Sequence, residues 1–474
     1  MTARRSAIVA GGGIGGLAAA IGLRRAGWTV TVLEQANELR EVGAGWSFAP
    51  NAVRAADALG VGDEFRAVSV PTEAGATLRV PSGRYLMRFA NGRDTPLLAN
   101  HRADLQRVLL DHLPAEWVHT GAEVTGVEQS DTGVTVTYRT RPGSRQAADM
   151  SQAIDGSRQA ATNASPQAAA DTTRQIVGGM AQQAATNLAR QPVGDMPQQD
   201  AANASRQAAT DPAQPDAADL SFQAAGTSPQ AAYVSLQVEA DVLIGADGIH
   251  SAVRRAVWPD LPAPVFQRIL CWRGVTEPGS VWPVGGFQTW GRGARFGAHP
   301  LSGQRVFWFL AVRAPEPGMR FDDDLAEVRR RVGGWHEPIP ALLSATPPDS
   351  LLCHDIADLD PLESYVDRRV ALLGDAAHAM TPFLAQGACQ ALEDAAVLAA
   401  VLAGDIPTAL ARYDQARRPR SQRVRRMARQ DPAISLSTSP VVYGLMTGLT
   451  RLAGGGVAAR KAGRLWDWAP PTLV

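Results

Sequence analysis

Cysteine and long apolar runs are scarce in this chain of 474 residues. The three cysteines, Cys271, Cys353 and Cys389, lie far apart, which suits reduced thiols and shows neither a disulfide framework nor a zinc-binding spacing. No apolar run reaches the ~18 residues of a membrane-spanning helix, and the first residues lead into an expected strand rather than a signal peptide. Lys plus Arg and Asp plus Glu both number 46, so no charge excess favours nucleic acid or an anionic membrane. We therefore expect a soluble cytoplasmic protein of two or three domains, without a metal site.

The first 34 residues are rich in glycine. The apolar run 6–10 predicts a buried strand, residues 11–16 a glycine turn, residues 17–26 a helix, and residues 29–33 a second strand that ends at Glu34. This order, with an acid at the tip of the second strand, is typical of a dinucleotide-binding βαβ unit. The pattern fits NAD and FAD equally well.

The glycines of this turn have distinct physical roles in such a unit. Gly11 allows the tight turn, Gly13 lets the backbone approach a pyrophosphate, and Gly16 lets the helix pack close to the strand. The helix N-terminus then faces the phosphates, and Glu34 can bind the ribose hydroxyls. The alternative is a turn that serves packing alone, which the agreement of strand, helix and acid disfavours.

Further strands and helices are expected along the chain. The first part has helices at 50–59 and 101–112 and strands at 76–80, 84–89, 123–128 and 133–139. The later part has strands at 239–245 and 369–374, a second-domain sheet from 268–275, 286–290, 294–299 and 305–312, and helices at 321–332, 387–402 and from 408 onward. We interpret the basic runs 417–420 and 423–429 as a solvated helix face rather than a nucleic-acid site.

Residues 157–228 form an octapeptide repeat. Its third position is almost always Gln, and large apolar residues are scarce. Eight residues turn a helix by about 800°, so repeated side chains drift around the helix and build no apolar stripe. We therefore expect 145–232 to be a disordered or weakly helical insertion in a surface hairpin. A partner-binding solenoid is the less favoured alternative.

Two later stretches carry acids at the ends of expected strands. Residues 241–254 read as a strand, an Asp247-Gly248 turn and a helix start. A second buried strand delivers Asp375 to its tip, and a loop with Pro382 then leads into the helix that begins at Gly387. The acid suits a polyol hydroxyl, and the helix N-terminus suits a developing anion on a flat ring.

Together these stretches resemble the class A flavoprotein monooxygenases, the para-hydroxybenzoate hydroxylase-like family. The resemblance covers nearly the whole chain except the repeat, and it is strongest to aromatic hydroxylases that act on salicylate, 3-hydroxybenzoate or urate. The closing residues 466–471 also resemble tails seen there. The resemblance implies an α/β (α+β) fold with a Rossmann-like FAD-binding domain, an interleaved substrate domain on a mostly antiparallel sheet, and C-terminal helices.

The resemblance also implies a division of the chain. The FAD-binding domain would comprise 1–75, 101–144, 233–262 and 350–404, the substrate domain 76–100 and 263–349, the insertion 145–232, and the helical region 405–474. Residues carried over to FAD are Gly11, Gly13 and Gly16 (pyrophosphate), Glu34 (ribose), Ser47, Arg102 (phosphates or flavin), Val124 (adenine), Asp247 and Gly248 (FAD and pyridine nucleotide), Asp375 (ribityl chain), and Gln386, Gly387 and Ala388 (flavin pyrimidine end).

The implied reaction hydroxylates a phenolic or carboxylated aromatic compound. NADH or NADPH would reduce bound FAD, and O2 would give a flavin C4a-hydroperoxide that transfers one oxygen atom to the ring. Candidate substrate contacts are Trp46, Trp290, Trp308 and the catalytic candidates Arg295, His299, Pro382 and Phe383. Arg295 would pair with a carboxylate or phenolate, or else be a surface arginine. His299 would deprotonate a phenol, or else be a hydrogen-bonded structural histidine; His378 is expected to be structural.

Two departures from the family bear on the site. Ala385 stands where relatives often have glycine before Gln386, so a methyl group could narrow the oxygen pocket or change the backbone angles. Phe307 and Phe383 stand where urate hydroxylase-like proteins have polar residues, which argues against urate as the substrate.

Three alternatives stay open at this point. One is epoxidation or natural-product tailoring on the same fold, another is a flavin-binding protein without turnover, and the third is an NAD dehydrogenase. The choice between NADH and NADPH, and between a monomer and a homodimer, also stays open.

Overall fold

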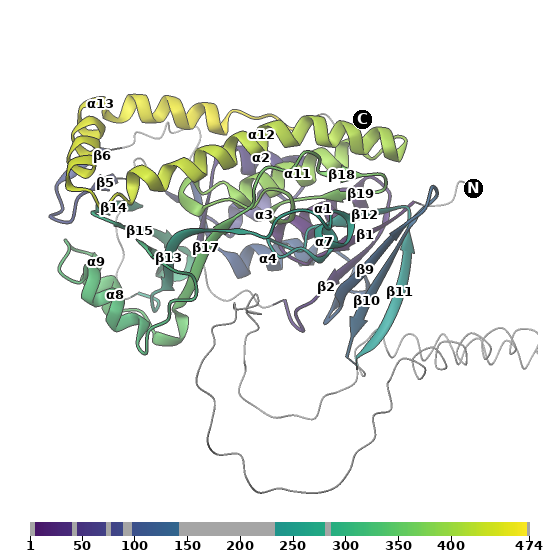
Figure 1. Cartoon of the computed structure of the whole chain (residues 1–474), viewed down its shortest axis with the longest axis horizontal. Coiled ribbons are helices and arrows are strands. Elements are labelled where there is room, and N and C mark those ends of the chain that lie inside the picture. Colours follow the sequence, from purple (N-terminus) through teal and green to yellow (C-terminus); the bar gives the residue numbers. More distant parts are fainter. Residues whose placement is uncertain are drawn as a thin grey trace, which may run out of the picture. The chain divides into compact units, whose positions relative to one another are not determined.

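The computed structural model describes residues 5–39, 45–72, 77–88, 97–141, 233–279 and 286–471 (Figure 1). The chain divides into two compact units, and nearly all described residues belong to the first, which comprises Met1–Thr140 and Val234–Val474. The expected insertion 145–232 lies outside the described residues.

A mainly parallel sheet of six strands holds the glycine turn. Its order is β18-β19-β12-β1-β2-β8, and only β18 runs antiparallel to its neighbour. The strands are β1 (Ser6–Ala10), β2 (Thr29–Glu34), β8 (Val118–Thr120), β12 (Val242–Gly245), β18 (Val366–Asp367) and β19 (Val370–Leu372). Every residue of β12 and β19 is buried, as is typical of a sheet covered on both faces.

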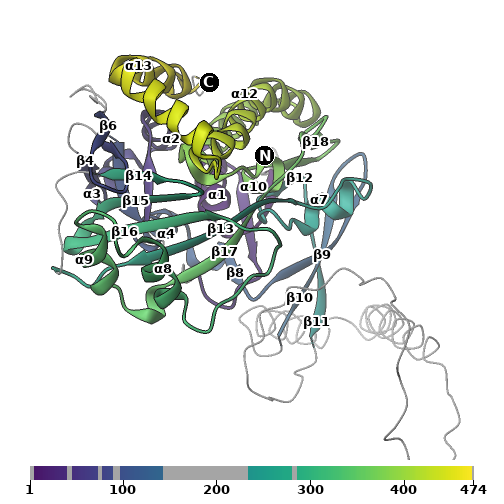
Figure 2. The same ribbon diagram turned by 60° about the vertical axis from the view of Figure 1, so that its left-hand side comes forward.

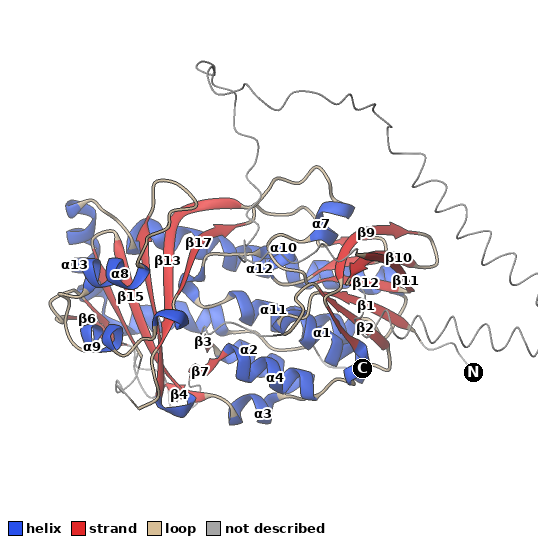
Figure 3. Cartoon of the chain, turned by 90° about the horizontal axis from the view of Figure 1, so that it is seen from below, coloured by secondary structure: helices blue, strands red, loops and turns tan. Residues whose placement is uncertain are grey.

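Helices α1 (Ile14–Arg25) and α11 (Gly387–Val401) pack against each other beside this sheet. Both are buried along most of their length. A Cβ at Gly22 would lie 2.6 Å from the Cβ of Ala399, so the two helices touch where both side chains are small. Figure 3 shows α1, α2, α4 and α11 between the parallel sheet and a second, larger sheet.

The larger sheet has seven strands in the order β17-β13-β16-β15-β14-β5-β6, antiparallel except where β14 meets β5. They are β5 (Thr77–Arg79), β6 (Tyr85–Arg88), β13 (Val265–Val275), β14 (Phe287–Gly291), β15 (Ala294–Leu301), β16 (Arg305–Arg313) and β17 (Leu352–Asp358). Side chains alternate between its two faces. One face, with Trp272, Phe296 and Trp308, packs under α8 (Asp324–Val332) and α9 (Ile339–Ser344) (Figure 2).

Two smaller antiparallel sheets complete the strands. One is β3-β7-β4, from β3 (Gly45–Phe48), β4 (Val70–Thr72) and β7 (Leu97–His101); the other is β11-β10-β9, from β9 (Glu123–Gln129), β10 (Val134–Thr140) and β11 (Val234–Ala240). The expected single strand 239–245 is wrong, because β11 ends at Ala240 and β12 begins at Val242 in a different sheet. Thr140 pairs with Val234, so the insertion joins two paired strands, as the hairpin hypothesis requires.

The remaining elements are mostly helical: α2 (Pro50–Leu59), α3 (Gly62–Ala67), α4 (Arg102–Asp111), η1 (Ala115–Trp117), α7 (Ala252–Val257), η2 (Ser302–Gln304), η3 (Pro348–Ser350), α10 (Asp375–His378), η4 (Pro382–Leu384), α12 (Ile406–Ser435) and α13 (Pro440–Trp466). No described helix is long and apolar enough to cross a lipid bilayer. The expected α/β (α+β) fold class is confirmed, and the expected domain boundaries stay a prediction.

Helix α12 corrects the interpretation of the basic runs. Arg417 is 0 % exposed and Arg425 is 5 % exposed, so this part of the helix is not a solvated face. Arg417 pairs with Asp394 (Nε to Oδ1, 2.6 Å) and with Glu393, both on α11. The arginines therefore join α12 to α11. Only part of the run, such as Arg423, is exposed.

Candidate active site

The acids and glycines singled out in the sequence meet at one edge of the parallel sheet. Gly11 follows β1, Asp247 lies two residues beyond β12, Asp375 follows β19 by three residues, and Glu34 ends β2. Because β19, β12, β1 and β2 are neighbours, their carboxyl ends lie side by side. This edge is where open α/β sheets bind their ligands.

The three glycines of the turn differ in what surrounds them. A Cβ at Gly11, where φ is +105°, would lie 2.3 Å from the carbonyl oxygen of Ala246, and one at Gly16 would lie 2.0 Å from the carbonyl oxygen of Gly11. Gly13 has no atom within 4 Å of such a Cβ. Two glycines therefore permit close backbone packing, whereas the third leaves the backbone open to a ligand.

Glu34 is held against the glycine turn. Its carboxylate accepts hydrogen bonds from the backbone N–H groups of Gly12 and Ala36, both at 2.7 Å. The backbone N–H of Ala122 donates to the carbonyl oxygen of Glu34, which brings the start of β9, with the buried Val124, to the same corner. The two residues assigned to the adenosine half of FAD therefore lie near each other.

Several polar atoms at this edge have no partner among the described residues. They are Oγ of Ser47, Oδ1 of Asp247 and Nε2 of Gln386, and all three are buried. The other oxygen of Asp247 accepts from the backbone N–H of Val253 at 3.0 Å, and Gly248 turns the chain with φ of +80°. Buried polar groups normally have partners, so these atoms fit a bound polar cofactor.

Asp375 and Arg102 form the charged part of the same region. Asp375 is open to solvent, yet the surrounding protein desolvates it and raises its pKa, against the opposing effect of His378, Arg102 and Arg273. Desolvation lowers the pKa of Arg102 to about 10, although Asp375 favours its charged form. An accessible carboxylate inside a concave protein surface fits the hydroxyl-rich chain of FAD.

The loop between α10 and α11 brings the flavin candidates close to Asp375. A Cβ at Gly387, the first residue of α11, would lie 3.9 Å from Oδ1 of Asp375. Gln386 is buried, whereas Gly387 and Ala388 are partly exposed at the open helix N-terminus. Ala385 has φ of +51° and ψ of +37°, the left-handed conformation that glycine adopts most easily. The alanine thus occupies a glycine-like backbone conformation and also lines the neighbouring pocket.

A buried polar network supports this loop from below. His378, 1 % exposed, binds Oδ2 of Asp394 through Nε2 at 2.6 Å, as expected of a structural histidine. Desolvation would raise the pKa of Asp394, but His378 and Arg417 outweigh it and hold that pKa at about 2. Glu393 accepts from Nδ2 of Asn51 at 2.7 Å. The network thus connects α2, α10, α11 and α12.

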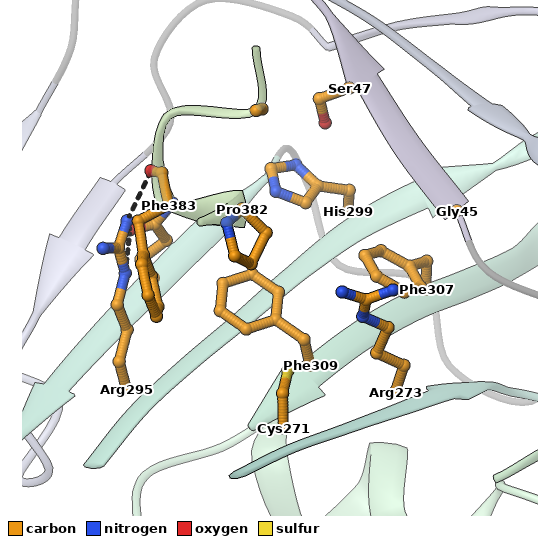
Figure 4. Close-up of a pocket in the computed structure, with 12 residues that line it drawn as sticks. Gly45, Ser47, Cys271, Arg273, Arg295, His299, Phe307, Phe309, Pro382 and Phe383 are labelled. Atoms are coloured by element: carbon orange, nitrogen blue, oxygen red, sulfur yellow. Dashed lines mark hydrogen bonds between the residues drawn. The ribbon is translucent and has the colours of Figure 1, made fainter. Parts of the chain in front are cut away.

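A pocket of about 120 Å³ lies between this loop and the seven-stranded sheet (Figure 4). Its walls come from β3, from η4 and from the face of the sheet opposite α8. The lining residues are Gly45, Ser47, Cys271, Arg273, Gln288, Arg295, His299, Phe307, Phe309, Pro382, Phe383 and Ala385. All four catalytic candidates, Arg295, His299, Pro382 and Phe383, are therefore brought together.

Arg295 is neither a surface arginine nor free of protein partners. It is 4 % exposed, and its guanidinium binds Asp431 (Oδ1, 2.6 Å), Gln288 and Ser435 and donates to the carbonyl oxygen of Phe383 at 3.2 Å. The surface alternative is wrong. Arg295 joins β15 to α12 and η4, which positions Phe383 at the pocket.

His299 does not have the hydrogen bond expected of a structural histidine. Its Nδ1 is buried without a partner among the described residues. Desolvation, reinforced by Arg295, lowers its pKa to about 4. The imidazole is therefore neutral near pH 7 and lines the pocket, and its Nδ1 lies beside Gly286, where an added Cβ would be 2.7 Å away.

Two of the three tryptophans proposed to contact the substrate, Trp290 and Trp308, do not line the pocket. Trp308 is fully buried on the opposite face of the sheet, where its indole N–H donates to Thr346 at 2.8 Å. Trp290 does not line the pocket and packs beside β5 and β6. The side chain of Trp46 lies outside the described parts. Trp308 is thus a wrong prediction: neighbours along a strand face opposite ways, and Phe307 and Phe309 take the pocket side.

The sequence argument missed Cys271, Arg273, Gln288 and Phe309 as lining residues. Alternation along the strands would have identified these residues, but only if the face covered by α8 and α9 had been known. Gly297 has a related role, because a Cβ there would lie 2.3 Å from the ring of Phe309. The absent side chain makes room for that ring across β15.

The comparisons with known proteins agree with this geometry. A family profile described as an FAD binding domain matches residues 4–158 and 354–428. This match agrees with the glycines and acids at the carboxyl edge of the parallel sheet, and it defines the chain as an FAD-binding protein.

Relatives of known activity extend the comparison to nearly the whole chain. The aurachin C monooxygenase/isomerase of Stigmatella aurantiaca is 30 % identical over 86 % of this chain and 84 % of its own length. The FAD-dependent urate hydroxylase of Klebsiella pneumoniae is 29 % identical over 87 % and 85 %. The crystal structure of Klebsiella pneumoniae HpxO complexed with FAD and uric acid superimposes with a TM-score of 0.70 at 26 % identity, covering 98 % of this chain and 97 % of that chain. The chain therefore belongs to the family of FAD-dependent aromatic monooxygenases, as its motifs predicted.

Proposed function

We propose that this monooxygenase hydroxylates a small phenolic or carboxylated aromatic compound with NADH or NADPH and O2. The observation that carries the proposal is the pocket, in which three phenylalanines and a proline meet a histidine whose Nδ1 has no partner among the described residues. In the balanced reaction, the ring gains one oxygen atom, the second oxygen atom leaves as water, and the nicotinamide is oxidised.

Residues of the parallel-sheet edge would hold the cofactor in this proposal. Gly13 leaves space that the pyrophosphate would occupy, Glu34 would bind the ribose, and Asp375 would bind the ribityl chain. Bound FAD would supply the redox chemistry that activates dioxygen. The N-terminus of α11, a helix of 15 residues, would stabilise negative charge beside Gly387.

Residues of the seven-stranded sheet and of η4 would hold the substrate. Phe307, Phe309 and Phe383 offer ring faces and edges to an aromatic compound and exclude water from it. His299, neutral at pH 7, would accept the proton of a phenol hydroxyl, which makes the ring more electron-rich. The lining phenylalanines 307 and 383 also support a substrate less polar than urate.

Substrate-stimulated turnover of the purified yellow protein tests the proposal. A panel of phenols and aromatic carboxylates is screened for stimulated oxidation of NADH and NADPH, and hits are repeated under isotopically labelled dioxygen. We expect at least one compound to gain a single labelled oxygen atom. Stimulated oxidation that yields only hydrogen peroxide, or no stimulation across the panel, would count against hydroxylation of this substrate class.

A further inference from the structure

Arg273 lines the pocket, and the reaction proposed above assigns it no role. It lies on β13, the strand next to the edge strand β17 in the seven-stranded sheet, and its side chain is partly exposed and lines the pocket. Figure 4 shows its guanidinium beside Phe307, at the opposite end of the pocket from Arg295, with Phe309 and Pro382 between them. Within the described ranges, no carboxylate oxygen lies within 4.0 Å of it.

Three buried arginines of the described chain bind acceptors within the protein. Arg295 and Arg417 bind carboxylates, and Arg254 donates to the carbonyl oxygen of Ala376 at 2.8 Å. Arg273 has no hydrogen bond to a strong acceptor among the described residues, and its neighbour Cys271 offers only a thiol, which is a weak acceptor. Its fork of N–H donors therefore retains most of its hydrogen-bonding capacity toward the pocket.

The residues directly opposite Arg273 on the two neighbouring strands carry no charge. Arg273 lies opposite Phe309 on β16 and opposite Leu352 on β17. Nearby, Arg102 adds a second positive charge, and Asp375 is the acid that interacts with both. This side of the pocket is thus cationic, whereas the rest of its wall is largely aromatic.

We propose that Arg273 binds the carboxylate of an aromatic acid substrate and selects it over neutral aromatic compounds. The planar guanidinium can donate two parallel hydrogen bonds to a carboxylate, which fixes the direction of the ring that carries it. The ring then lies among Phe309, Phe383 and Pro382. This proposal rests on the proposed function and names the substrate class within it.

An arginine without a carboxylate partner should bind an aromatic acid more tightly than the corresponding neutral amide. A hydrogen bond to a charged group contributes about 1.5–3 kcal/mol, so an acid should bind on the order of 10- to 100-fold more tightly than its neutral amide. The amide has nearly the same shape, so the difference reports charge rather than fit.

Benzoate and benzamide titrated into the FAD-loaded protein test the proposal without turnover, because aromatic ligands beside a flavin change its absorbance. We expect the wild type to prefer benzoate by at least tenfold. In R273Q the preference should fall below threefold through weaker benzoate binding, and in R273K it should be intermediate. R268Q is the matched control, because Arg268 lies on the same strand but is exposed and does not line the pocket.

Several outcomes would overturn the proposal. A wild type that binds benzamide as well as benzoate, or shows no response to benzoate, rules out an anion anchor. If R273Q still prefers benzoate over benzamide, a group other than Arg273 causes the preference. Loss of FAD from both R273Q and R273K would make Arg273 a cofactor residue. Because benzoate binding needs no turnover, a preference that depends on Arg273 would stand even if the screen for hydroxylation failed.

Discussion

The two sheets position functional residues in different ways. In the parallel sheet, Gly11, Glu34, Asp247 and Asp375 all lie at or just beyond strand ends, so function is concentrated at one edge. In the seven-stranded sheet, Arg273, Arg295, Phe307 and Phe309 lie within the strands, so function is spread over one face. At the edge of the parallel sheet, backbone atoms limit the space for an added side chain. On the face of the seven-stranded sheet, neighbouring side chains limit that space. Added methyl groups can test this difference.

Gly11→Ala should have the largest effect on stability. The new Cβ would meet the backbone oxygen of Ala246 at 2.3 Å, and φ of +105° is itself strained for alanine. Overpacking against backbone and the unfavourable φ together should cost about 3 kcal/mol or more of unfolding free energy. Chemical denaturation and flavin content measure the result, and we expect loss of FAD as well.

Gly27→Ala is the control for that substitution. Gly27 has φ of +87° but no atom within 4 Å of an added Cβ, so it isolates the cost of the backbone angle. Equal losses in both variants would contradict the importance of close backbone packing at Ala246.

The difference between the sheets also explains what the sequence could predict. Strand-end motifs are local, so Gly11, Glu34, Asp247 and Asp375 could be placed at one edge from their neighbours in the chain. The partners of Arg295 are not local: Asp431 lies 136 positions away, and no periodicity reports that contact.

The face of each strand posed the same difficulty. Trp308 and Phe307 are adjacent in β16, and only the position of α8 and α9 decides which of them reaches the pocket. Likewise, the burial of Arg417 follows from the two acids that α11 presents to it, 23 and 24 positions earlier. Long-range packing therefore supplied what local patterns could not.

Asp375→Ala should weaken cofactor binding without unfolding the protein. Its carboxylate is accessible and accepts no hydrogen bond from any described residue, so its removal breaks no internal hydrogen bond. Loss of a charge-assisted hydrogen bond should reduce FAD affinity on the order of 10- to 100-fold. The flavin-to-protein ratio after dialysis measures the effect. Asp349→Ala, at an exposed acid of η3, is the control, and full flavin retention in Asp375→Ala would refute the ribityl assignment.

His299 should make the folding stability of the protein decrease at acidic pH. Its pKa in the folded state is about 4, below the ordinary value of 6.5, because burial disfavours the charged imidazole. Between these pH values the unfolded chain takes up a proton that the folded chain does not, so folding stability falls as pH drops from 6.5 toward 4. Allowing for the partial exposure of the ring, the loss should be of the order of 2 kcal/mol.

Thermal unfolding at pH 7.5 and pH 4.5 compares the wild type with His299→Gln. We expect the wild type to lose more stability than the variant over this interval. Equal losses would mean that His299 is protonated as readily in the folded protein as in the unfolded chain.

Gly297→Ala should have the smallest effect on stability and a selective effect on the pocket. As at Gly11, the new Cβ would meet an atom at 2.3 Å, but that atom belongs to the ring of Phe309. A side-chain ring can move where a backbone carbonyl cannot, so the cost should be about 1 kcal/mol. The displaced ring should enter the pocket, weakening benzoate binding while flavin content stays at the wild-type level. Phe309→Leu in the same background should restore part of the binding, because the smaller side chain relieves the contact. A Gly297→Ala protein that loses FAD as Gly11→Ala does would remove the distinction between the backbone-limited edge and the side-chain-limited face.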